Sequence, residues 1–326
     1  MGSLDSLPKD VSGEEEKELT VLVTGFGVRE TLKAIQTPLY RHRGLASGTA
    51  STTCLSSTLG AEWEQYPTAW FAHVLTSSCS SQPFKDGYPI NPSWEIASSL
   101  PKYLPWDRVK DPSHRTSSKM PRVRLLVYPQ AVRVNYQTVR EVVPPLWDNP
   151  DQKIDLALHI GMAGPTNRYS IERRGHRDGY RHKDVDGNFL EDEKRREREG
   201  DEWIWHGTPS ELLTDLDIGD IYKRWVRRSP ERPYTDNFLP AQDNGGNGPE
   251  LRISEDPGHY LCDFIYFTSL AHLYKQHRPR QVLFLHVPAN GAPDFIKTGT
   301  ELATQLLRSM VESEVEKKAM DSTASN

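Results

Sequence analysis

The sequence predicts an α/β fold, a three-layer α/β/α sandwich around a mixed, mostly parallel sheet, in a single domain. Short apolar runs of strand length alternate along the chain with segments whose apolar residues recur at helical spacing. One run, 155–161, is apolar nearly throughout, as in a parallel strand that is buried on both faces. Strands that alternate with helices in this way form a sheet whose two faces are covered by helices.

The elements of this fold are expected in a definite order. The expected strands are 19–24, which leads into the turn Gly25-Phe26-Gly27, then 123–128, 155–161 and 282–287. The expected helices are 137–146, 263–274 and 300–314. We expect the first helix to stop at Pro144-Pro145, because proline lacks the N–H that a helix interior needs.

The remaining segments interrupt this alternation. Residues 1–18 and 316–326 are expected to be a disordered leader and tail around a domain at 19–315. Dense mixed charge makes 188–208 an expected surface insertion. Asparagine and glycine predict a second surface insertion at 241–250.

Composition excludes several classes of function. The 326 residues carry a formal net charge of −5, which argues against binding nucleic acid or a membrane surface through bulk charge. No apolar run reaches the roughly 18 residues that span a bilayer, and the polar, acidic start has no signal-peptide pattern. Three cysteines without CxxC spacing indicate a reducing compartment, the cytoplasm, and no structural zinc.

Cys262 is the best candidate for a reactive group. It opens the expected helix at 263–274, and the next strand, 282–287, delivers His286 near its end. A helix N-terminus and an imidazolium both favour the thiolate, which is the reactive form of cysteine. The alternative is that Cys262 is a small buried hydrophobic residue, as lone cysteines often are.

A third group is needed to orient the histidine. Glu172 follows the strand at 155–161, near the sheet edge where α/β folds assemble their sites. On pattern alone, however, Glu172 is one of 45 acidic residues.

Six short motifs along the chain carry a resemblance. They are 21–27 (Val-Leu-Val-Thr-Gly-Phe-Gly), 83–84 with 91–95 (Pro-Phe and Asn-Pro-Ser-Trp-Glu), 136–139 with 159–164, 171–176, 258–263 with 266–270, and 284–288 (Phe-Leu-His-Val-Pro). In this order they resemble the pyroglutamyl peptidase I family, cysteine peptidases that remove an N-terminal pyroglutamate. The resemblance covers most of 19–290 apart from insertions.

The resemblance assigns roles to individual residues. It implies that Cys262 is the nucleophile, that His286 is the general base and later acid, and that Glu172 orients His286. It also implies that Phe26 and Phe84 line the pyroglutamate pocket, whereas without the resemblance both would be read as core residues. The implied substrates are peptides with an N-terminal pyroglutamate, with no metal and no cofactor, and the oligomeric state is left open.

The chain departs from the family pattern at two positions near the site. His259 stands where the family commonly has arginine, and Arg177 stands where it often has asparagine. His259 is three residues from Cys262 and badly placed to act as its base, so His286 keeps that role. The departures bear on rate and substrate preference rather than on the type of reaction.

Residues 28–82 are expected to be an insertion that the family lacks. Joining Gly27 to Pro83 restores an unbroken Gly-Phe-Gly-Pro-Phe, and the segment holds Cys54 and Cys79. Val28-Arg29 can be encoded by a splice-donor string and Gln82 by an acceptor, so we interpret the segment as a translated intron. The alternative is a genuine lineage insertion.

Two other functions remain open at this point. An interrupted pocket loop would leave a catalytically impaired or inactive family member that acts as a binding module. Gly25-Phe26-Gly27 after a strand could also be a nucleotide-binding turn, but the third glycine and the helix start of that fingerprint are missing.

Overall fold

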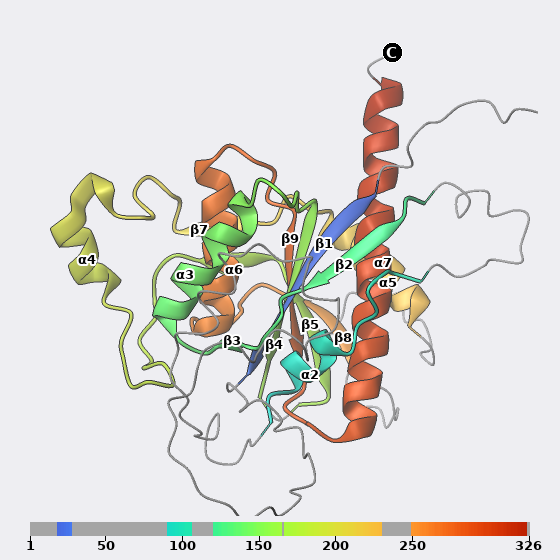
Figure 1. The fold of residues 1–326 in the computed structure, drawn as a ribbon, viewed down its shortest axis with the longest axis horizontal. Helices are drawn as coiled ribbons and strands as arrows, with labels where there is room; N and C mark the ends of the chain where they lie inside the picture. Colours follow the sequence, from blue (N-terminus) through green and yellow to red (C-terminus); the bar gives the residue numbers. More distant parts are fainter. Residues whose placement is uncertain (1–17, 28–89, 106–119, 165, 230–248, 325–326) are drawn as a thin grey trace, which may run out of the picture.

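The computed structural model describes residues 18–27, 90–105, 120–164, 166–229 and 249–324, and the structural statements below concern these residues. A seven-stranded sheet runs through the centre of the fold, with helices on both of its faces (Figure 1). The strands of the main path lie in the order β2-β1-β4-β9-β5-β8, and β3 pairs with the end of β1.

The strands and helices follow one another as the sequence analysis expects, with several additions. The strands are β1 (Leu19–Gly27), β2 (Val123–Val127), β3 (Val132–Arg133), β4 (Leu156–Met162), β5 (Arg168–Glu172), β6 (Arg174–His176), β7 (Glu211–Leu213), β8 (Glu250–Ser254) and β9 (Val282–Val287). The helices are α2 (Pro92–Ser98), α3 (Tyr136–Asp148), α4 (Asp192–Glu199), α5 (Ile218–Arg228), α6 (Leu261–Lys275) and α7 (Pro293–Ala324).

The sheet is mixed and mostly parallel, which confirms the predicted fold class. Strands β2, β1, β4 and β9 are parallel neighbours. Strand β5 runs antiparallel to β9, and β8 is parallel to β5. The site elements therefore meet where the strand direction reverses, between β9 and β5.

Two apolar cores lie on opposite faces of this sheet. Side chains alternate along a strand, so Val21 and Val23 of β1 enter one core and Leu22 enters the other. The first core is completed by α2, α5 and α7, and the second by α3 and α6. Helix α6 belongs to the second core and is buried on nearly all sides.

The motif Asn91-Pro92-Ser93 fastens α2 to the end of β1. Asn91 caps α2 by accepting from the backbone N–H of Ser93 at 3.1 Å. The Ser93 hydroxyl accepts from the backbone N–H of Phe26 at 3.0 Å. A Cβ on Gly25 would lie 2.5 Å from the Ser93 carbonyl oxygen, so only glycine permits this close approach.

Two predicted helix ends were wrong. Helix α3 continues through Pro144-Pro145 to Asp148, because Leu146 and Trp147 are buried and the Trp147 indole donates to Ser269 Oγ at 3.2 Å. Packing there outweighs the lost helical hydrogen bonds. Helix α7 continues through Ala324, although a disordered tail was expected from residue 316.

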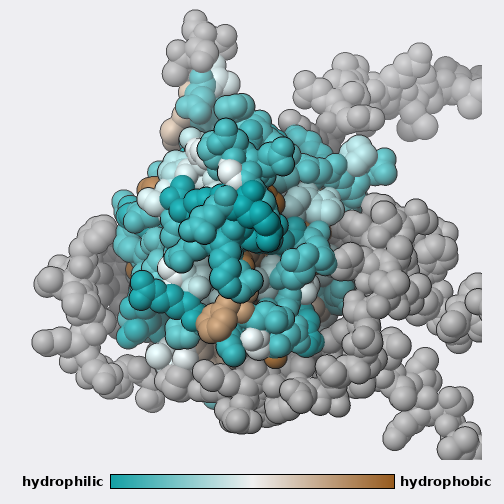
Figure 2. Space-filling model, turned by 90° about the vertical axis from the view of Figure 1, so that its left-hand side faces the viewer, coloured by the Kyte–Doolittle hydropathy of each residue, from teal (hydrophilic) through white to brown (hydrophobic). Residues whose placement is uncertain are grey.

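The insertion at 188–208 is only partly a surface feature. Half of the residues of its charged helix α4 are exposed, and hydrophilic residues dominate that face of the molecule (Figure 2). The first residue of the helix, Asp192, is buried and pairs with Arg140 of α3. Trp203 and Trp205 are also buried and join the core around α6. The segment therefore contributes to packing as well as to the surface.

Other expectations lie outside the described residues. These are the leader at 1–17, the segment 28–82 with its intron interpretation, Phe84, and the insertion at 241–250 up to residue 248. No helix in the described part of the chain is long and apolar enough to cross a membrane.

Candidate active site

Cys262 lies in the first turn of α6, as the sequence analysis expected. The residue before the helix, Tyr260, has extended backbone angles and makes no side-chain capping bond. The first N–H groups of a helix have no partner within the helix, and the helix dipole places partial positive charge there. The half-buried Cys262 thiol therefore lies where the backbone favours a negative charge.

His286 and Glu172 are brought together by neighbouring antiparallel strands. In the register of β9 and β5, His286 lies opposite Ser170, and Glu172 lies opposite Phe284. His286 and Glu172 are thus diagonal neighbours, close enough for long side chains to meet. The imidazole Nδ1 donates to Glu172 Oε1 at 2.8 Å, which leaves Nε2 for another partner.

The charges of this site act on one another. Burial of the His286 imidazole disfavours its charged form, but the neighbouring Cys262 and Glu172 side chains, through charge and hydrogen bonding, raise the pKa of His286 to about 10. Glu172 is 1% exposed, and its Oε2 has no hydrogen-bond partner within the described ranges. A buried carboxylate with so few partners depends on the charge of the imidazolium.

Hydrogen bonds from α6 hold Glu172, and hydrogen bonds from the central strands hold α6. The Tyr266 hydroxyl of α6 donates to the Glu172 carbonyl oxygen at 2.9 Å. His159 of β4 hydrogen-bonds Thr24 of β1 and Ser269 of α6, each at 2.8 Å. Burial lowers the pKa of His159 to about 3, so this ring is neutral and is a structural link between strands and helix.

Gly161 makes room for the thiol. It lies beside His286 in the parallel register of β4 and β9. A Cβ built on Gly161 would lie 2.8 Å from Cys262 Sγ and 2.4 Å from the Phe284 ring. Both distances are shorter than carbon and sulfur atoms tolerate, so a side chain here would displace the thiol or the ring.

Replacement of Gly161 by alanine is therefore expected to misplace Cys262. We expect the catalytic activity of the thiol to fall on the order of 10²-fold, with slower alkylation of the thiol by iodoacetamide. Gly164→Ala is the matched control, because a Cβ there meets nothing within 4 Å. Equal activity of the two variants would show that the Gly161 contact does not position the thiol.

The structure thus brings together three of the five predicted site residues. Cys262, His286 and Glu172 form a thiol, imidazole and carboxylate series, the arrangement used in nucleophilic catalysis by cysteine. Phe26 is 3% exposed and belongs to the core on the α3 and α6 side. Phe84 lies outside the described residues.

Two features of the site were missed by the sequence analysis. One is the spatial role of Gly161, for which the only signal is a glycine ending a buried strand. The other is Asp263, which is fully buried next to Cys262 and accepts from both the backbone and the ring of His176, at 2.8 and 2.9 Å. An acidic residue within the otherwise apolar run at the start of α6 was the signal for this second feature.

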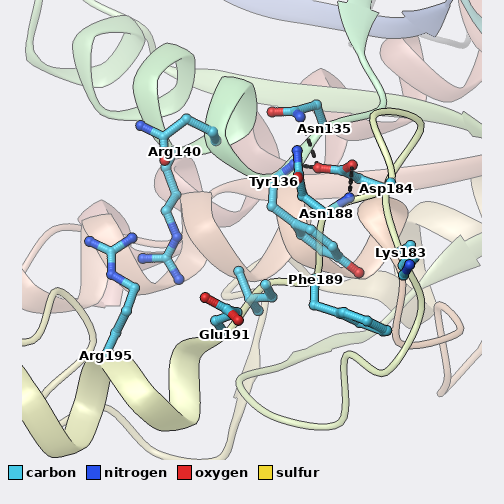
Figure 3. Close-up of a pocket in the computed structure, with 12 residues that line it drawn as sticks. Asn135, Tyr136, Arg140, Lys183, Asp184, Asn188, Phe189, Glu191 and Arg195 are labelled. Atoms are coloured by element: carbon cyan, nitrogen blue, oxygen red, sulfur yellow. Dashed lines mark hydrogen bonds between the residues drawn. The ribbon is translucent and has the colours of Figure 1, made fainter.

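A polar cavity of about 510 Å³ lies beside the start of α3, facing α4 (Figure 3). Its lining includes Asn135, Tyr136, Arg140, Lys183, Glu191 and Arg195, and none of the three site residues. Tyr136 is the link to the site, since its ring lies 6.3 Å from that of Tyr260, two residues before Cys262. The mixed charges that line this cavity make it different from the small apolar pocket that suits a lactam ring.

Comparison with known proteins supports the resemblance seen in the motifs. Human pyroglutamyl-peptidase 1 is 28% identical over 162 residues, which are 50% of this chain and 62% of the human protein. Pyrrolidone-carboxylate peptidase of Pyrococcus furiosus is 28% identical over 208 residues, 64% of this chain and 77% of that protein. These named relatives confirm the predicted resemblance to pyroglutamyl peptidases.

Comparison with solved structures and with family models adds less support to this resemblance. The crystal structure of pyrrolidone carboxyl peptidase from Fervidobacterium islandicum AW-1 has a TM-score of 0.48 and 20% identity, covering 91% of this chain and 99% of that one. No family model matches the sequence. The chain spans less than two thirds of the length of the human relative that it matches.

Proposed function

We propose that this chain is a cysteine peptidase that removes an N-terminal pyroglutamyl residue from peptides. The observation that carries the proposal is the bonded series of Cys262, His286 and Glu172, at the positions of the motifs that resemble pyroglutamyl peptidase I. The named relatives support the substrate class. The proposed reaction needs no metal or cofactor.

The first half of the reaction forms an acyl-enzyme. The Cys262 thiolate attacks the pyroglutamyl carbonyl carbon, and a C–S bond forms while the carbonyl oxygen becomes an oxyanion. Nε2 of the His286 imidazolium then gives its proton to the departing amine as the C–N bond breaks. The products are a thioester on Cys262 and a peptide with a new N-terminus.

The second half regenerates the thiol. Neutral His286 takes a proton from water, whose oxygen attacks the thioester carbonyl. The C–S bond breaks, pyroglutamate leaves, and Cys262 and His286 return to the thiolate and imidazolium pair. Glu172 stabilises the positive ring at each stage through its 2.8 Å bond to Nδ1.

The N-terminus of α6 is the proposed site for the oxyanion. It has no side-chain cap, and its first-turn N–H groups lie in the same turn as Cys262. Donors fixed in this way stabilise a developing negative charge without reorganisation. Phe26 and Phe84 are proposed to shape the lactam pocket, with Phe26 held at its backbone by Ser93.

Hydrolysis of a chromogenic pyroglutamyl amide by the purified chain tests the proposal. We expect release of the chromophore, loss of activity after iodoacetamide treatment, and protection from that treatment by a pyroglutamate analogue. A prolyl amide, which has the same ring without the lactam carbonyl, is the matched control substrate. Protection by the analogue without any turnover would favour a binding module with the same fold.

Deletion of residues 28–82 is expected to raise activity. The deletion joins Gly27 to Pro83 and places Phe26 and Phe84 on one short turn, so the pocket would be held more precisely. Since small misplacements cost on the order of 10²-fold in rate, we expect a gain of that order in kcat/KM. Equal activity of the full chain and the deletion variant would contradict the proposed impairment.

A further inference from the structure

Two histidines and a buried carboxylate converge beside the nucleophile helix. They are His176 at the end of β6, His259 just before α6, and Asp263 in the first turn of α6. One ligand atom from each lies within 4.8 Å of the others. The proposed reaction does not use His259.

The distances between the ligand atoms suit a small cation with tetrahedral coordination. The Nδ1 atoms of His176 and His259 lie 2.9 and 3.6 Å from Asp263 Oδ2. Ligands bound to zinc at about 2.1 Å in tetrahedral geometry lie roughly 3.3 to 3.4 Å apart. The two observed distances lie on either side of that value, so small side-chain movements would complete three corners of the site.

The exposure of the three side chains allows a cation to enter. The Asp263 side chain is 0% exposed, that of His176 is 14% exposed and that of His259 is 41% exposed. The buried carboxylate would be the fixed anchor, and the open side at His259 would admit the ion with water as a fourth ligand. Asp256 adds negative charge around His176, which also favours a cation.

The surroundings hold the ligands in place. Asp263 Oδ1 accepts from the His176 backbone N–H at 2.8 Å, which directs Oδ2 toward the rings. His259 has a φ of 44°, an unfavourable angle for a residue with a side chain, and the preceding Gly258 has a φ of 94°. Gly179 has a φ of 97°, and a Cβ there would lie 2.8 Å from His259 Nδ1. The backbone thus gives space to this particular ring position.

We propose that His176, His259 and Asp263 bind a divalent cation of the zinc type, which ties the segment before α6 to β6. Binding requires that His259 Nδ1 leave its 3.0 Å hydrogen bond to the Asp178 carbonyl oxygen and that His176 Nδ1 lose its proton. Soft or borderline cations with nitrogen preference fit this donor set better than Mg²⁺ or Ca²⁺, which prefer oxygen ligands. The proposal does not depend on peptidase activity.

Zinc binding to a Cys262→Ser variant tests this site without the catalytic thiol. Zn²⁺ affinity is measured by competition with a chromogenic chelator, in that variant and in the same variant with His259→Ala. We expect His259→Ala to weaken binding on the order of 10²-fold. His206→Ala is the matched control, because His206 is exposed and outside the cluster, and it is expected to bind as the parent does. Cys54 and Cys79 are present in all three proteins, so their contribution cancels.

Thermal unfolding supplies a second readout. At a Zn²⁺ concentration of 100 Kd, we expect the Tm of the Cys262→Ser parent to rise by about 5 °C, with a rise below about 1 °C for His259→Ala and no rise with Mg²⁺. If His259→Ala were unfolded by circular dichroism, His259→Gln would serve instead, since glutamine keeps a polar side chain of similar length without the imidazole. Equal zinc affinity in the parent and the His259 variant, or no binding at all, would overturn the proposal.

Discussion

Replacing Cys262 with serine is expected to lower kcat/KM for a pyroglutamyl amide by about 10⁴-fold or more. A serine hydroxyl does not form an ion pair with the His286 imidazolium as a thiol does, so the attacking group would be neutral. The helix N-terminus, His286 and Glu172 would all remain in place. The loss in kcat/KM would therefore measure the contribution of the thiol nucleophile alone.

The chain offers its own control for this change. The same cysteine-to-serine substitution at Cys54 or Cys79 is expected to leave kcat/KM within about twofold, since neither cysteine belongs to the proposed catalytic series. Thermal unfolding of Cys262→Ser should match that of the unchanged chain. If Cys262→Ser kept more than a tenth of the activity, thiol attack would be excluded as the main route.

Glu172→Gln is expected to lower kcat on the order of 10³-fold and to change the pH profile. Glutamine has nearly the same shape and can still accept from His286 Nδ1, but it removes the negative charge. The pKa of His286, raised to about 10 in the unchanged chain, should fall. The ion pair between the His286 imidazolium and the Cys262 thiolate would then be lost at a lower pH than in the unchanged chain.

The direction in which stability and activity change with pH follows from the raised pKa of His286. A histidine whose folded pKa is above the ordinary 6.5 stabilises the fold fully below about 6.5, and that contribution is lost as pH rises toward 10. Activity of the unchanged chain should therefore decline on the alkaline side near pH 10. In Glu172→Gln the decline should begin at lower pH.

Rate measurements between pH 6 and pH 11 would show this shift. Glu301→Gln, an exposed glutamate on α7, is the matched control and should keep the alkaline decline of the unchanged chain. An unshifted profile in Glu172→Gln, with full activity, would mean that the buried carboxylate does not act on His286.

Much of the fold was predictable because its signals are local. Strand β9 occupies the predicted range 282–287, the strand predicted at 123–128 ends one residue earlier, and the strand predicted at 155–161 is displaced by one residue. Their apolar runs are long enough to identify them without knowledge of their neighbours. The end of α3 was not predictable, because burial of Trp147 against α6 decides it.

The site residues also divide into those with a local signal in the sequence and those without one. Cys262 and His286 stand out by their positions at a helix start and near a strand end, whereas Glu172 needed the family resemblance. Strand β5, which carries Glu172, is five residues long with charged ends. The side-chain partner of Glu172, His286, is 114 residues away in the sequence. No local pattern reports a pairing over such a distance, and the same holds for the contact of Gly161 with the thiol.

The position of β9 between β4 and β5 has a consequence for how the chain folds during synthesis. Both neighbours leave the ribosome more than 100 residues before β9, yet neither can complete its hydrogen bonding until β9 arrives. Until then the middle of the sheet has two open edges, which are prone to pair with other chains. A nascent chain that stops before residue 282 should therefore be inactive and aggregation-prone, and the arrival of β9 should close both edges and bring His286 to Glu172 in one step.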